Sequence, residues 1–163
     1  MSQISLEAIR SLREQTSAGV MDCKKALEEA GGDVDRAIAL LQERGLRLAS
    51  KKSDRSTQEG VVESYIHMGG RVGAMVEVNC ETDFVAKNED FINFVKELSE
   101  LNNSNNSDIK KLNKTQMKNK KKVDENLVAL IAKIGEKITI GRAKTFREFK
   151  IPIQKAARPI KKR

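Results

Sequence analysis

The 163-residue sequence has no tryptophan and a single histidine, His67. No set of nucleophile, base and orienting group can be assembled around that histidine at a recognisable spacing. The only cysteines, Cys23 and Cys80, are far apart and have no histidine or cysteine at the spacing of a metal site. We therefore expect a protein that is not an enzyme, uses no metal or other cofactor, and keeps two buried free thiols in a reducing compartment.

Long hydrophobic runs are also absent. No apolar stretch approaches the roughly 20 residues that cross a bilayer. The first five residues have neither the apolar core of a signal peptide nor the Arg- and Ser-rich composition of a transit peptide. These absences predict no membrane association, and a protein that works in the compartment where it is made or whose leader has been removed.

Acidic residues are scarce in the second part of the chain. The formal net charge is +8, yet residues 1–100 hold 13 Lys/Arg and 18 Asp/Glu, whereas residues 101–163 hold 18 Lys/Arg and 5 Asp/Glu. This asymmetry indicates an acidic folded part followed by a basic part. Any contact with nucleic acid would therefore fall to residues 101–163.

The first 50 residues show the spacing of three short helices. Ser5, Asp22 and Asp33 are placed as N-caps, and apolar residues recur at helical spacing after each of them. Gly31-Gly32 is expected to end the second helix and Gly45 the third. The sequence thus predicts a three-helix domain over 1–50, followed by a polar linker over 51–59.

Beyond the linker the pattern becomes that of a hairpin. Residues 61–68 and 72–80 read as strands, the second with alternating apolar and polar residues, and Gly69-Gly70-Arg71 joins them. These glycines lie between two strands and lack the spacing of a phosphate-binding loop, which favours a hairpin turn.

The fold class predicted for the whole chain is α+β. Apolar residues at helical spacing predict helices over 83–101 and from an Asp124 cap to Gly135, and alternation predicts a third strand over 136–149. The three-helix domain is then followed by a core, residues 60–101 and 123–150, in which helices flank a three-stranded antiparallel sheet.

Two polar segments fall outside these elements. The low-complexity tract 102–122, rich in Asn, Ser and Lys, is expected to be a disordered or mobile loop inserted into the core. Residues 151–163 read as a basic tail. RNA or ribosome contact would follow from the charge of the lysine run 118–122, but no aromatic residue interleaves it, which favours a solvated surface.

The stretch 79–91 presents an acid and an aromatic residue, Asp83 and Phe84, where a strand ends and a helix begins. Burial in the core explains a large aromatic residue at such a corner. A second explanation is that Phe84 projects as an anchor for a pocket on a partner. The residue pattern leaves both open.

Three stretches resemble the elongation factor Ts family: NCETDFVAKN at 79–88, TSAGVMDCKKAL at 16–27 and LIAKIGE at 130–136. They follow the order of that family, and the resemblance covers about 1–101 and 123–149. It implies that the N-terminal domain is the ubiquitin-associated-like three-helix domain of the family and that the rest resembles its dimerisation-domain core.

The resemblance also implies a function and its residues. Members of the family bind elongation factor Tu, both GDP-bound and nucleotide-free, and promote GDP release so that GTP can bind. Phe84 then matches the residue that enters an apolar pocket of elongation factor Tu, with Asp83 as its polar companion and Thr82 and Val85 positioning the corner. Secondary contacts with the same partner are implied for Arg13, Val20, Met21 and Lys24. No direct nucleic acid contact is required, and weak RNA or ribosome contact by 101–163 is an additional expectation.

The chain also departs from the family pattern. The tract 102–122 stands where relatives carry a longer middle, and nothing beyond 149 matches, so a short form with reduced middle and C-terminal parts is expected. The alternatives are a ribosome- or RNA-associated basic protein and a binding module that no longer catalyses exchange. The hairpin around Ser64–Arg71 resembles the cyanobacterial and plastid branch, which predicts an organelle-encoded protein of the chloroplast stroma, with the bacterial cytoplasm as the alternative.

Overall fold

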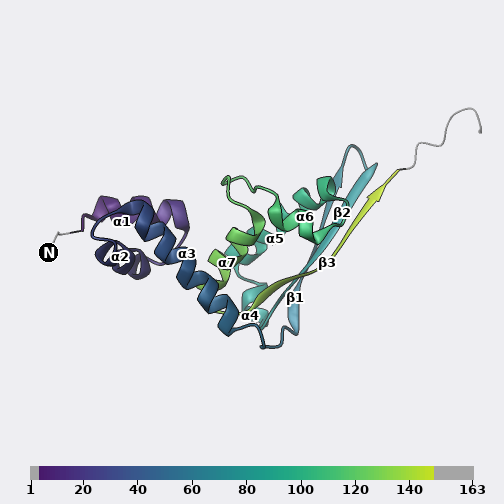
Figure 1. The fold of residues 1–163 in the computed structure, drawn as a ribbon. Helices are drawn as coiled ribbons and strands as arrows, with labels where there is room; N and C mark the ends of the chain where they lie inside the picture. The colour runs from purple at the N-terminus through teal and green to yellow at the C-terminus, as the bar shows by residue number, and fades with distance from the viewer. Residues whose placement is uncertain (1–3, 149–163) are drawn as a thin grey trace, which may run out of the picture.

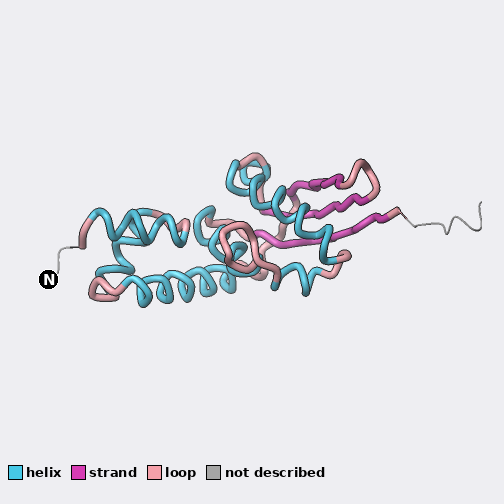
Figure 2. Tube along the Cα trace, turned by 90° about the horizontal axis from the view of Figure 1, so that it is seen from above, coloured by secondary structure: helices cyan, strands magenta, loops and turns pink. Residues whose placement is uncertain are grey.

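The computed structural model describes residues 4–148 and has a mixed α+β fold, as predicted. The elements in chain order are α1 (Leu6–Thr16), α2 (Val20–Glu29), α3 (Val34–Lys51), β1 (Glu59–His67), β2 (Val72–Cys80), α4 (Asp83–Ala86), α5 (Glu89–Asn105), α6 (Ile109–Lys114), α7 (Val123–Ile134) and β3 (Ile138–Arg147). Helices α1 and α2 lie at one end of the molecule and the strands toward the other, and α3 runs from the first two helices to the strands (Figures 1 and 2). Within residues 4–148, no helix is long and apolar enough to cross a membrane.

The first two helices and the first half of α3 form what we call the helical module. Its buried residues are Ile9, Leu12, Cys23, Ala26, Leu27, Ala30 and Ala37. The side chains of Ser5 and Asp33 cap α1 and α3 as predicted, because each accepts a hydrogen bond from a backbone N–H three residues ahead. Asp22 does not cap α2. That helix begins after Gly19, and Asp22 lies in its first turn, where the positive end of the helix dipole stabilises its carboxylate.

Helix α3 does not end at Gly45, contrary to the expectation from sequence. It continues to Lys51 and reaches the sheet region. Ala37 packs within the helical module, and Ala49 packs against the second buried cluster of the molecule. Tertiary packing on both halves outweighs the cost of a glycine inside the helix.

The three strands form one antiparallel sheet in the order β1-β2-β3. Gly69 and Gly70 lie in the turn between β1 and β2 with φ of 64° and 87°, so the predicted hairpin turn is confirmed. On β2, Ala74, Val76, Val78 and Cys80 are buried on one face, whereas Met75, between Ala74 and Val76, is exposed on the other. The helices therefore cover one face of the sheet, whereas Val62, Ile66, Met75 and Phe146 are exposed apolar residues of the strands.

Two helices occupy the segment predicted as a single helix over 83–101. The chain turns at Lys87, and the Asn88 side chain accepts a hydrogen bond from the Phe91 backbone N–H to start α5. Helix α5 buries Phe91, Phe94, Val95 and Leu98 against the sheet. Together with α4, α6 and α7 it forms, with the strands, what we call the sheet core.

The tract 102–122 is not a loop without structure, so that expectation was wrong. Helix α5 continues to Asn105, and Asp108 caps α6 by accepting hydrogen bonds from Lys110 and Lys111 N–H. Leu112 and Met117 are buried in the sheet core. The tract is therefore ordered by two well-placed apolar side chains and local capping, although its average composition is polar. Residues 151–163, predicted to be a basic tail, lie outside the described residues.

Helix α7 begins at Val123 after the N-cap Lys122, so Asp124 is a first-turn residue and not the cap that was predicted. Both cysteines are buried and free, as expected. Burial raises the pKa of the Cys80 thiol to about 11, and also raises that of Cys23, so both remain protonated at neutral pH. His67 forms a 3.0 Å hydrogen bond to the Tyr65 hydroxyl.

Candidate functional site

The end of β2 and the single turn of α4 form a sharp corner at residues 81–85. Val85 faces inward and is 8% exposed, whereas its neighbour Phe84 is 81% exposed, the largest fraction among the exposed large apolar residues of the described chain. A phenylalanine left in water forgoes about 1.5–3 kcal/mol that its burial would contribute. Within residues 4–148 the ring of Phe84 is therefore not buried, which agrees with the second of the two explanations left open by the sequence.

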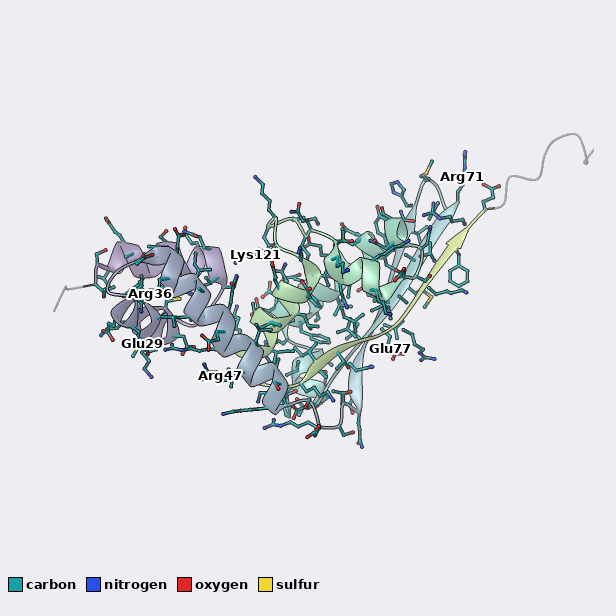
Figure 3. All side chains as sticks on the ribbon, viewed as in Figure 1. Glu29, Arg36, Arg47, Arg71, Glu77 and Lys121 are labelled. Carbon is teal, nitrogen blue, oxygen red and sulfur yellow. The ribbon has the colours of Figure 1, made fainter. Side chains whose placement is uncertain are left out.

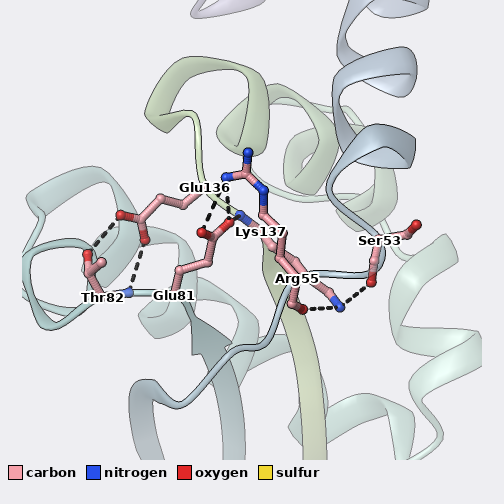
Figure 4. Close-up of polar contacts among 6 residues, drawn as sticks. All are labelled: Ser53, Arg55, Glu81, Thr82, Glu136 and Lys137. Carbon is pink, nitrogen blue, oxygen red and sulfur yellow. Dashed lines mark hydrogen bonds and ion pairs between the residues drawn. The ribbon is translucent and has the colours of Figure 1, made fainter.

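Thr82 is held by one carboxylate from a distant part of the chain. The Thr82 backbone N–H donates to Glu136 Oε2 at 3.1 Å, and the Thr82 hydroxyl donates to Glu136 Oε1 at 2.8 Å (Figure 4). Because its hydroxyl is used in this way, Thr82 makes no side-chain cap on α4, although it occupies the N-cap position. Both donors of Thr82 therefore fix the corner to the turn between α7 and β3.

The adjacent Glu81 extends this support to the connection between α3 and β1. Its carboxylate accepts from the Lys137 backbone N–H at 2.6 Å and lies 3.3 Å from Arg55 Nη1. The Lys137 ammonium in turn donates to the backbone carbonyls of Ser53 and Arg55. We call the six residues of Figure 4 the corner network: Ser53, Arg55, Glu81, Thr82, Glu136 and Lys137. Its hydrogen bonds join three segments that are far apart in the sequence.

The hydrogen bond from the Lys137 backbone N–H, with the nearby Arg55, lowers the pKa of Glu81 below its ordinary value of 4.5. Asp83 is also stabilised as a carboxylate. Lys87, directly after α4, donates its ammonium to Asp83 Oδ2 at 2.8 Å, and this contact lowers the Asp83 pKa and raises the Lys87 pKa. Asp83 therefore presents a full negative charge beside Phe84 at neutral pH.

The secondary residues implied by the family resemblance lie on α1 and α2, around the loop that joins these helices. Arg13 and Lys24 are exposed, and Val20 and Met21 are 49% and 61% exposed. Lys24 faces Glu28 of the same helix at 3.9 Å. The loop between α1 and α2 lines the same cavity as Leu41 and Gly45 in the middle of α3, whereas the corner is hydrogen-bonded to Arg55, which follows the C-terminal end of α3. The structure thus brings 82–85 together at one place and holds the other four residues at another.

Sequence reasoning missed the support of the corner. Glu136 lies 54 positions after Thr82, and Lys137 lies 56 after Glu81. Glu136 belongs to the stretch 130–136 that resembles the family, and it lies directly after Gly135, which ends the helix. This position was the signal that could have marked Glu136 as a functional residue. Nothing in the local pattern, however, indicates which residue its carboxylate contacts.

No candidate metal centre appears among residues 4–148, where no group of three or more His, Cys, Asp or Glu side chains is arranged to hold a metal ion. The corner instead combines a projecting aromatic ring, a neighbouring carboxylate and a rigid base. Such an arrangement suits non-covalent insertion into a partner.

Comparison with known proteins connects the corner to a family. A family model described as elongation factor TS matches residues 81–154, beginning at the corner. Elongation factor Ts of Clostridium kluyveri is 49% identical over 142 residues, which cover 85% of this chain and 46% of that protein. The protein of the same name from Clostridium perfringens is 45% identical over 144 residues, 88% of this chain and 48% of its own length.

A further relative, elongation factor Ts of Desulforamulus reducens, is 60% identical over 99 residues, which cover 61% of this chain and 46% of that protein. The chain therefore spans about half the length of the curated relatives that it matches.

Proposed function

The chain belongs to the elongation factor Ts family, and from this membership we propose that it acts in translation elongation as a guanine nucleotide exchange factor. It binds elongation factor Tu, in the GDP-bound and nucleotide-free states, and promotes GDP release so that GTP can bind. It performs no covalent chemistry and needs no cofactor. The observation that carries the proposal is Phe84, 81% exposed on a turn fixed by the corner network.

The proposed role of Phe84 is that of a wedge. Its ring enters an apolar pocket of elongation factor Tu, where burial contributes about 1.5–3 kcal/mol, equivalent to about ten- to a hundredfold in an equilibrium constant. This gain is obtained only in the complex, because the ring is 81% exposed among residues 4–148 of the free chain. Val85 holds the turn on the inner side, since its side chain is buried in the sheet core.

Asp83 supplies charge beside the wedge. Its carboxylate is held by Lys87 in the free chain, and both side chains are exposed enough to exchange partners on docking. In the complex the Asp83 carboxylate competes with the groups of elongation factor Tu that hold magnesium and the phosphates. Thr82 keeps Asp83 and Phe84 in place through its two hydrogen bonds to Glu136.

The helical module supplies the second part of the interface through Arg13, Val20, Met21 and Lys24. Val20 and Met21 are exposed apolar side chains in the first turn of α2, Lys24 follows on the same helix, and Arg13 lies in the last turn of α1. Together they add apolar area and positive charge that one wedge cannot supply alone.

Exchange follows from thermodynamic linkage. If this chain binds nucleotide-free elongation factor Tu more tightly than the GDP complex, then it weakens GDP binding by the same factor. The proposal therefore requires that the Phe84 corner and the helical module together bind the nucleotide-free form better.

The experiment that tests the function measures release of a fluorescent GDP from a bacterial elongation factor Tu. We expect the wild-type chain to accelerate release and Phe84→Ala to lose about ten- to a hundredfold of that acceleration. Phe146→Ala is the matched control, because Phe146 is also exposed, on β3, and lies away from the corner. It should leave release unchanged.

The other outcomes separate the alternatives. Acceleration that is insensitive to Phe84→Ala would keep the exchange function and remove the wedge. Binding to elongation factor Tu without acceleration would favour a binding module that no longer catalyses exchange.

For the compartment we propose the bacterial cytoplasm. The relatives reported above come from bacteria, and they give no support to the chloroplast stroma, which stays a prediction from the hairpin alone. Fractionation of the source cells would distinguish the two.

A weak contact with RNA or the ribosome is a second candidate for residues 101–163. It is favoured by Lys110 and Lys114, which are exposed one turn apart on α6 and have no carboxylate within 4.0 Å among the described residues. Because like charges at this spacing repel, a polyanion would relieve them. The contact predicts RNA binding that weakens steeply with salt and survives Phe84→Ala.

A further inference from the structure

Helix α3 connects the helical module with the sheet core through one continuous face. Leu41, Gly45 and Ala49 follow one another at intervals of four residues and therefore lie on the same side of the helix. Leu41 packs against the buried cluster of the helical module, and Ala49 packs against that of the sheet core. Gly45 lies between them and is buried.

Gly45 is a point of close approach between α3 and α7. A Cβ atom at position 45 would lie 2.9 Å from Cγ1 of Val128, 3.6 Å from the Val128 carbonyl oxygen and 3.7 Å from Cβ of Ala132. The first distance is shorter than carbon atoms allow. A glycine inside a helix is less favourable than an alanine, and here its lack of a side chain permits the helices to touch.

The rest of the junction is open. The packing of α3 on α7 is the main contact between elements of the helical module and of the sheet core. Beside it lies a cavity of about 570 Å³, lined by the loop between α1 and α2, by α3, and by α5 and α7. One polar contact crosses this side: the Lys121 ammonium reaches the backbone carbonyl of Gln15, and Figure 3 shows Lys121 between the helical module and the strands.

We propose that Gly45 is a positioning residue that sets the orientation of the helical module relative to the Phe84 corner. Because the cavity leaves the other side unpacked, the spacing of α3 and α7 at Gly45 decides where α1 and α2 point. The inference rests on the proposed function: with this spacing, Val20 and Met21 contact elongation factor Tu at the same time as Phe84, and a larger side chain at position 45 prevents it.

The orientation itself is testable without any partner. Spin labels are attached at Ser11→Cys on α1 and Lys96→Cys on α5, both exposed positions, while the two native cysteines are buried. We expect Gly45→Leu to shift or broaden the distance distribution between the labels. Ser50→Leu, which adds the same side chain at an exposed position of α3, should not.

A second pair of variants guards against loss of folding. Gly45→Ala alone introduces the contact with Val128, and Val128→Ala in the same chain removes it. The distance distribution should change in the single variant and return in the double variant. Circular dichroism and thermal melting check that each protein is folded. An unchanged distribution in folded Gly45→Leu would overturn the proposal.

The functional test compares the loss of affinity caused by Met21→Ala in the wild-type chain and in Gly45→Leu. In the wild type, Met21→Ala should weaken binding to nucleotide-free elongation factor Tu by about tenfold, as for a buried apolar anchor. In Gly45→Leu, Met21→Ala should cost nothing further, whereas Phe84→Ala should still reduce affinity. An equal cost of Met21→Ala in both backgrounds would contradict the positioning role.

The proposed function can fail separately from this inference. If the wild-type chain does not bind elongation factor Tu, the exchange function is wrong, and the label distances alone then decide whether Gly45 orients the module.

Discussion

Helices α4 and α6 are both short and both belong to the sheet core, but α6 buries a large apolar side chain whereas α4 exposes one. Helix α6, six residues long, buries Leu112 completely. Helix α4, four residues long, buries Val85 and leaves the larger Phe84 exposed. Helices this short are not stable alone, so each depends on tertiary contacts. Leu112 supplies such a contact for α6, whereas α4 is held by Val85 and the corner network.

The difference indicates what each helix is for. Leu112 stabilises the chain that contains it. The ring of Phe84 is exposed in the described part of the chain, and the corner network fixes the turn that carries it to two distant segments. This contrast agrees with the proposed role of Phe84 in binding a partner. Changes at Leu112 should therefore act on stability, and changes at the corner on partner binding.

The largest effect on stability is expected from Leu112→Ala. Removing a fully buried leucine leaves a cavity and should lower the free energy of unfolding by about 2–5 kcal/mol. Urea unfolding followed by circular dichroism measures this change. GDP release at low temperature, where the variant stays folded, should keep its rate. A cost below about 1 kcal/mol would show that α6 does not belong to the core.

A smaller effect on stability and a clear effect on exchange are expected from Glu136→Ala. The variant removes both acceptors of Thr82 and should lower the free energy of unfolding by about 1–3 kcal/mol. GDP release should slow because α4 loses its fixed position, even though Phe84 is still present. Glu125→Ala is the control. Glu125 lies in the first turn of α7, where its carboxylate accepts a hydrogen bond from the Lys122 backbone N–H. Its removal should affect stability alone.

The pH dependence of stability reports on Glu81. Its pKa in the folded chain lies below the ordinary 4.5 because it accepts the Lys137 N–H and faces Arg55. The unfolded chain therefore binds this proton more readily, so the stabilisation is present above pH 4.5 and is lost as the pH falls toward the folded-state pKa. Denaturation between pH 7 and 3 should show a smaller decrease in Glu81→Gln than in the wild type. Equal curves would exclude this role.

The smallest effect on stability is expected from Phe84→Ala itself. Because the ring is exposed, its removal should change the free energy of unfolding by no more than about 0.5 kcal/mol. The same denaturation series as for Leu112→Ala gives this value. A large destabilisation would mean that Phe84 contributes to the core, and the contrast between the two helices would fail.

Much of the fold could be predicted from the sequence. Periodicity identified three N-terminal helices, a hairpin joined by Gly69 and Gly70, and a helix ending at Gly135, because each depends on local pattern and backbone conformation. The division into domains stays a prediction. Gly45 was predicted to end α3, but its role depends on packing against Val128 of α7, more than 80 positions away. The tract 102–122 was also predicted wrongly, because Leu112 and Met117 are few among many polar residues.

The candidate site, too, could be predicted from the sequence only in part. Asp83 and Phe84 were identified by resemblance, while the residue pattern alone could not decide between burial and projection of Phe84. That decision depends on how α4 turns on the sheet core. The supporting contacts from Glu136 and Lys137 depend on segments that only the tertiary structure brings together. The proposed roles of Arg13, Val20, Met21 and Lys24 remain predictions.

The central claim is that Phe84 is held out of this chain in order to enter another protein. The most direct measurement is the rate of fluorescent GDP release from elongation factor Tu with the wild type, Phe84→Ala and Phe146→Ala at equal concentration. We predict acceleration by the wild type and by Phe146→Ala, and at least a tenfold loss with Phe84→Ala. Equal rates for the wild type and Phe84→Ala would contradict the claim.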